Sequence, residues 1–79
     1  MALKLSGKSW ENRVRLFLKA EIKRADISYE ELATRLKDHG LNESSTSIAN
    51  KLARGTFAAT WFLACLAALE LEGVRLEDI

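Results

Sequence analysis

Apolar residues recur at helical spacing near the start of the chain. The positions are Trp10, Val14, Phe17, Leu18, Ile22 and Ala25. This spacing predicts a first helix over about residues 10–25, with Ser9 as its N-cap and basic residues on its other face. Residues 1–8 show no such period and contain Ser6 and Gly7. We therefore expect a loosely ordered basic arm over residues 1–8 and a helical domain over residues 9–79.

A second helix is indicated by Ser28 and Glu31, because this spacing is that of a capping box. Its apolar stripe consists of Tyr29, Leu32, Ala33 and Leu36. Gly40 is the expected stop signal. If Gly40 takes the left-handed conformation, Leu41 folds back on Leu36, as in a Schellman ending.

A third, short helix is predicted over residues 44–54, with Asn42 or Ser44 as its cap and Gly55 as its stop. Ile48, Ala49 and Leu52 are expected to face inward. The outward positions carry small, polar or cationic side chains, namely Thr46, Ser47, Asn50, Lys51 and Arg54.

The fourth predicted helix begins after Thr56 as N-cap, runs from Phe57 to near Gly73, and is apolar nearly all round. One stripe would fill the core through Phe62, Cys65, Leu66 and Leu69. The other would form a dimer interface through Trp61, Ala64, Ala68 and Leu71. Alternatively, the first helix and the segment 74–79 cover both faces of this helix in a monomer.

Composition supports one small all-α domain, since 79 residues contain no proline and 48% are hydrophobic. A domain of this size buries only roughly 60% of the surface of its unfolded chain, which favours a homodimer. A single cysteine and the lack of a leader-like segment at the start favour a cytoplasmic location. Residues 1–25 hold seven Lys or Arg against two Glu, whereas the remainder is acidic. The basic surface is therefore expected at the N-terminal end.

The order of these elements resembles the helix-turn-helix of the lambda-repressor-like (Cro/XRE-type) family over roughly residues 10–79. The resemblance is carried by residues 28–33 (SYEELA), 47–55 (SIANKLARG), 66–69 (LAAL) and 73–79 (GVRLEDI). The run 50–67 also resembles a group of short, uncharacterised bacterial proteins, a domain of unknown function, in which an Asn-Lys-x-x-Arg-Gly-x-Phe stretch precedes an aromatic-rich helix. The turn between the second and third helices is several residues longer than in the larger family. Consequently, two alignments are possible, with either Ile48 or Ala49 facing inward.

The helix-turn-helix resemblance implies a four-helix lambda-repressor-like fold with a lengthened turn, acting as a homodimeric transcriptional regulator on double-stranded DNA. The third helix would enter the major groove, where Thr, Ser, Asn, Lys and Arg side chains suit base edges and phosphates. The nucleic-acid-binding residues expected on this basis are Thr46, Ser47, Asn50, Lys51, Arg54, Arg13 and Lys8. The alternative is a protein-interaction or antitoxin-like accessory module that uses the apolar helix 57–71 and binds no DNA.

Catalytic chemistry has little support in the sequence. The chain contains one His, one Cys and neither a glycine-rich phosphate loop nor metal-ligand spacing. His39 is expected at a helix end and Cys65 in the core. We therefore expect neither an enzyme nor a metal or cofactor site, and no association with a membrane.

Overall fold

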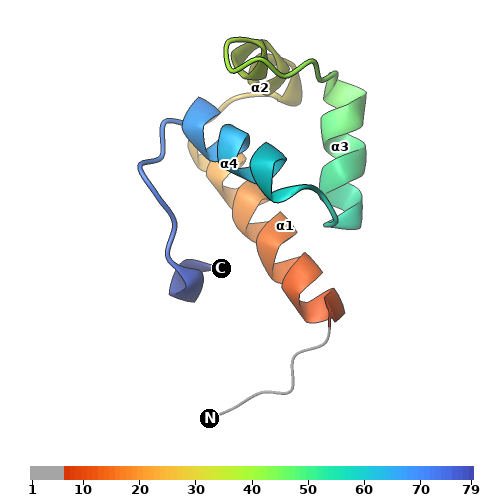
Figure 1. Cartoon of the computed structure of the whole chain (residues 1–79), viewed down its shortest axis with the longest axis vertical. Coiled ribbons are helices and arrows are strands. Elements are labelled where there is room, and N and C mark those ends of the chain that lie inside the picture. The colour runs from red at the N-terminus through yellow and green to blue at the C-terminus, as the bar shows by residue number, and fades with distance from the viewer. Residues whose placement is uncertain (1–6) are drawn as a thin grey trace.

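The computed structural model describes residues 7–79, with side chains from Trp10 onward. It contains α1 (Gly7–Arg24), α2 (Tyr29–Lys37), α3 (Ser45–Arg54), α4 (Ala59–Ala68) and the short 3-10 helix η1 (Leu76–Asp78) (Figure 1). The part described holds four α-helices and no strand, which confirms the all-α prediction.

Helix α1 begins earlier than expected. Its first residue is Gly7, so Gly7 and Lys8 belong to the helix rather than to an arm, and Ser9 lies inside the helix instead of capping it. The remainder of the predicted arm, residues 1–6, lies outside the described residues.

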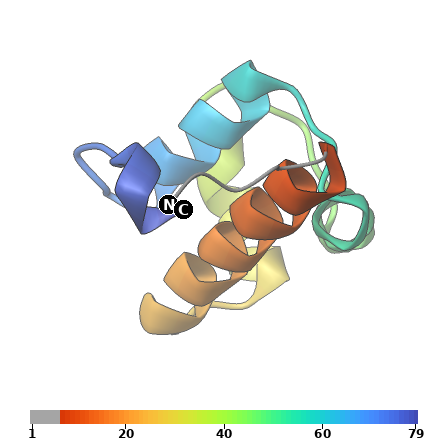
Figure 2. The same cartoon turned by 90° about the horizontal axis from the view of Figure 1, so that it is seen from below.

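The helices form one core. Helix α2 packs against α3 and α4, and α1 packs against α3. The rings of Phe17 in α1 and Phe62 in α4 approach to 6.3 Å between centroids, which joins these two helices. Figure 1 and Figure 2 both place α3 and the C-terminal segment at opposite edges, with α1 and α4 between them.

All four helices contribute to the buried core. Its members are Leu18, Ile22, Leu32, Ala33, Leu36, Ile48, Leu52, Trp61, Cys65, Leu66, Ala68 and Leu69. Burial of Cys65, Leu66 and Leu69 was expected, whereas Phe62 is only partly buried.

The predicted dimer interface on α4 needs correction. Trp61 and Ala68 are 5% and 4% exposed, and Ala64 and Leu71 pack partly buried against the core. These side chains are covered because α4 contacts neighbours on more than one side, including Phe57, whose ring lies 4.9 Å from that of Trp61. The chain itself therefore covers the stripe assigned to a second copy.

Schellman motifs end three of the helices. In α2, Gly40 has φ +83°, its N–H donates to the Lys37 carbonyl at 3.0 Å, and Leu41 N–H donates to the Leu36 carbonyl at 3.0 Å. This ending was predicted. The same bonding pattern occurs around Asp26 and Ile27 after α1, and around Glu70 and Leu71 after α4.

Helix α4 is shorter than predicted at both ends. It begins at Ala59, and Ala58 occupies the cap position without a side-chain hydrogen bond, so Thr56 is not the N-cap. Phe57 instead packs against Phe62 with centroids 6.0 Å apart, a hydrophobic staple that sets the entry of the chain. The helix ends before Glu70, which takes a left-handed conformation, and not near Gly73.

Gly55 marks the closest approach between two helices. It ends α3 in the left-handed conformation (φ +71°), and a Cβ placed on it would lie 2.8 Å from the Glu11 carbonyl oxygen of α1. Since that oxygen belongs to a helix backbone, it cannot move aside easily. Only a residue without a side chain permits this packing.

We expect Gly55→Ala to lower the free energy of unfolding by about 3 kcal/mol or more, because left-handed strain and a backbone overlap add together. Gly40→Ala is the matched control, since Gly40 is also left-handed but a Cβ there meets nothing within 4 Å. It should cost about 1 kcal/mol. Urea unfolding of both variants measures the difference, and equal losses would contradict the close approach.

Candidate nucleic-acid interface

Helix α3 presents one face to the core and the opposite face outward. Ser44 caps it, since its Oγ accepts a hydrogen bond from Ser47 N–H at 3.0 Å. Ile48 and Leu52 are 0% and 1% exposed, whereas Ala49 is only partly buried. The alignment with Ile48 inward is therefore the one that the structure adopts.

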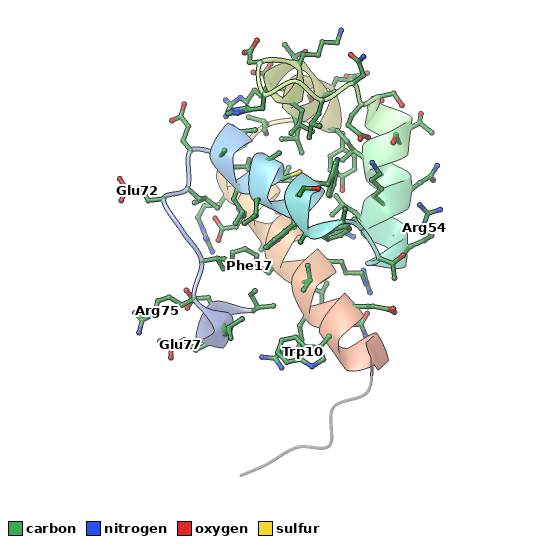
Figure 3. All side chains as sticks on the ribbon, in the orientation of Figure 1. Trp10, Phe17, Arg54, Glu72, Arg75 and Glu77 are labelled. Carbon is green, nitrogen blue, oxygen red and sulfur yellow. The ribbon has the colours of Figure 1, made fainter. Side chains whose placement is uncertain are left out.

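The outward face of α3 carries Thr46, Asn50 and Arg54, all exposed and spaced one turn apart. Figure 3 shows Arg54 at the outer edge of the molecule, directed away from the other helices. These three predicted binding residues thus form a continuous polar strip that ends in a cation.

Two other predicted residues on α3 have partners within the chain. Ser47 Oγ donates a hydrogen bond to Glu43 Oε1 at 2.6 Å, and Lys51 Nζ donates to Glu43 Oε2 at 2.6 Å. Lys51 Nζ also lies 5.0 Å from the ring centroid of Trp61. We call Glu43, Ser47, Lys51 and Trp61 the Glu43 cluster. Within it, the Glu43 carboxylate compensates the positive charge of Lys51, which the sequence analysis predicted on the binding surface.

The Glu43 carboxylate is nearly buried, with its side chain 9% exposed. Burial alone would raise its pKa, but the hydrogen bonds from Lys51 and Ser47 and the Lys51 charge outweigh burial, so the pKa is lowered from its ordinary 4.5. The buried indole Nε1–H of Trp61 makes no hydrogen bond within normal limits, yet lies near enough to the carboxylate to lower this pKa further. Glu43 is therefore ionised at neutral pH.

Arg13 is also engaged within the chain. Its Nε and Nη2 donate to the main-chain oxygen of Ile79 at 3.0 and 2.9 Å, and its guanidinium lies 4.3 Å from the ring centroid of Trp10. Arg13 therefore holds the C-terminal segment against α1 and does not join the strip on α3. The side chain of Lys8, the other predicted phosphate ligand, lies outside the described residues.

Glu43 is the residue that sequence reasoning missed. It precedes the Ser44 cap, and Glu43, Ser47 and Lys51 are spaced by four residues. This spacing places Ser47 and Lys51 on one face of α3, but Glu43 precedes the extended Ser44 cap and lies outside the helix. The spacing therefore gave only a weak signal, and the burial of the Glu43 carboxylate depends on tertiary packing.

Two further observations concern chemically reactive side chains among the described residues. Cys65 is fully buried, and burial followed by the charge of Glu43 raises the pKa of its thiol to about 12. Among the residues described, no three His, Cys, Asp or Glu side chains are grouped to hold a metal ion. None of the helices between residues 7 and 79 is long and apolar enough to cross a membrane.

We expect Glu43→Gln to lower the free energy of unfolding at pH 7 by about 1–3 kcal/mol, because Lys51 keeps its charge and loses its counter-charge. Since the folded pKa of Glu43 is depressed, its contribution is complete above about 4.5 and is lost as the pH falls below that value. The variant should therefore show a flatter dependence of stability on acid. Glu31→Gln is the control, because its ion pair with Arg35 lies at the surface of α2 and contributes little. Equal pH profiles for Glu43→Gln and wild type would contradict this role.

Comparison with known proteins gives a family and no function. The chain matches no curated protein and no solved structure. A family model described as a domain of unknown function, DUF6471, matches residues 10–74, which include nearly all of α1 and the whole of α2, α3 and α4. The chain therefore belongs to the DUF6471 family.

Proposed function

We propose that the protein binds double-stranded DNA as a homodimeric transcriptional regulator, in a lambda-repressor-like arrangement that places α3 in the major groove. The observation that carries this proposal is the polar strip of Thr46, Asn50 and Arg54 on the outward face of a helix whose inner face is fixed in the core. A recognition helix needs both properties, because base readout requires exposed side chains on a rigid support.

The relation between α2 and α3 supports a helix-turn-helix. The two helices are consecutive and packed against each other, as are the supporting and recognition helices of that motif. The turn between them, residues 38–44, is longer than the usual three or four residues. It is nevertheless held at three points, by the Schellman bond of Leu41, by the Glu43 cluster and by the Ser44 cap.

The chemistry of the strip suits base edges better than phosphates. Asn50 can form paired hydrogen bonds with adenine, and Thr46 can accept or donate at either type of base pair. Arg54, at the end of the helix, can reach guanine or a phosphate. Within α3, the whole of which is described, Arg54 is the cation whose charge is not compensated by Glu43. Binding by one chain would therefore be weak, and a dimer would double the number of cationic contacts.

The alternative of a protein-interaction module built on residues 57–71 has less support. Helix α4 uses Trp61, Cys65, Leu66 and Ala68 in the core of its own chain. Leu63, 59% exposed, is the large apolar side chain that α4 leaves outward. One such residue is ordinary on a protein surface and does not make a docking face.

Arg54→Ala should weaken binding to random-sequence duplex DNA and reduce the slope of log affinity against log salt by about 1 per chain, because one phosphate or base contact loses its cation. Fluorescence anisotropy between about 50 and about 200 mM salt measures both quantities. Lys37→Ala is the matched control, since Lys37 is an exposed cation of α2 that belongs to neither the strip on α3 nor the groove on α1 that Leu16 and Lys19 line. Absence of binding by wild type at the lower salt would overturn the proposal.

Glu43→Gln should have the opposite effect on the same assay. The substitution removes a negative charge beside α3 and leaves the Lys51 ammonium uncompensated. We therefore expect tighter non-specific binding and a salt slope that is steeper by up to about 1 per chain, at a temperature where the variant remains folded by circular dichroism. Double substitution with Lys51→Met should cancel the gain, and a gain that persists would show that Lys51 is not responsible.

A further inference from the structure

An apolar groove with a basic rim lies on the outer side of α1, where α1 meets the start of α2. Its volume is about 480 Å³, and its apolar lining includes Leu16, Ala20 and Tyr29. Leu16 is 54% exposed and lines the groove, so its apolar surface is available to a partner. Lys19 and Lys23 stand at the rim, and the described lining residues include no carboxylate. The groove therefore suits an apolar side chain flanked by negative charges.

The C-terminal segment of the chain has these properties. Leu76 is 72% exposed, the largest exposed fraction among the large apolar side chains described. Its neighbours in sequence are Arg75 and Glu77, which form an exposed ion pair, and Glu72 lies four residues before it. Figure 3 shows Glu72, Arg75 and Glu77 directed away from the helices. Residues 70–79 hold four carboxylates and one cation. The segment thus carries a net negative charge and one exposed leucine, and is complementary in charge and polarity to the groove.

The segment cannot reach the groove of its own chain. It runs along the other side of α1, where Val74 and Asp78 line a second hollow together with Phe17 and Arg24. The Arg13 hydrogen bonds hold Ile79 there. Ala20 lines both the groove and this second hollow, so it lies between the groove and the C-terminal segment. A twofold axis near Ala20 would place the groove of each copy against the segment of the other.

We propose that the groove on α1 receives the acidic C-terminal segment of a second copy of this chain, with Leu76 inserted beside Leu16 and with Lys19 and Lys23 facing Glu72 and Glu77. The contact is isologous, so each pairing occurs twice in the dimer. The inference rests on the homodimer of the proposed function. It places the dimer interface on α1 and not on the stripe of α4 that was expected from the sequence. It concerns association without DNA, so it can fail or succeed independently of DNA binding.

The test is a charge exchange between the two faces. One variant carries Lys19→Glu and Lys23→Glu, the other Glu72→Lys and Glu77→Lys, and all four positions are exposed. Sedimentation equilibrium in the absence of DNA measures the mass of wild type, of each variant and of an equimolar mixture, with circular dichroism as the check on folding. Lys37→Glu, a charge reversal at an exposed position of α2, is the control.

We expect wild type to be a dimer and each double variant to dissociate at least about tenfold more readily, because like charges then face each other at both copies of the contact. The mixture should regain a heterodimer, since the reversed faces complement each other, and Lys37→Glu should remain dimeric. A monomeric wild type, dimeric double variants, or a mixture that stays monomeric would each overturn the proposal. Leu16→Ser, which opens no cavity at an exposed site, should also weaken the dimer.

Discussion

The carboxylate of Glu43 is the interaction on which the arrangement of the outer helices depends. It ties the turn after α2 to α3 through Ser47 and Lys51, and it lies beside Trp61 of α4. A nearly buried charge is tolerated only when it is paired and hydrogen-bonded, so its partners have little freedom to move. The turn over residues 38–44 is thereby held in one conformation, and α3 is held in one orientation.

The same interaction determines the chemistry of the exposed face. Lys51 belongs to the sequence pattern of a basic recognition helix, but its charge is compensated before any ligand arrives. The face left outward consists of Thr46 and Asn50, with Arg54 at its end. In the proposed DNA complex, this surface would discriminate bases by hydrogen bonds while attracting phosphates weakly. The proposed association of two chains through α1 would supply the additional charge that a single chain lacks.

Local features were predictable because their causes are local. The Ser28 and Ser44 caps, the Gly40 ending with Leu41, and the left-handed Gly55 all depend on hydrogen bonds within five residues. The ends of α4 were not predictable in this way. Ala58 has no capping side chain, and Glu70 is an uncommon residue in the left-handed conformation, so packing of Phe57 and Leu71 decides where that helix starts and stops.

The amino-acid sequence by itself determined the helical class, the approximate helices and the inward register of most of them, because periodicity and capping act over one or two turns. Tertiary structure alone decided which stripe of the apolar α4 is covered and which cations remain available. Trp61 is buried by its own chain, and Arg13 is bonded to Ile79, 66 residues away. Burial and ion pairing depend on neighbours that are distant in sequence, so neither can be derived from a local pattern.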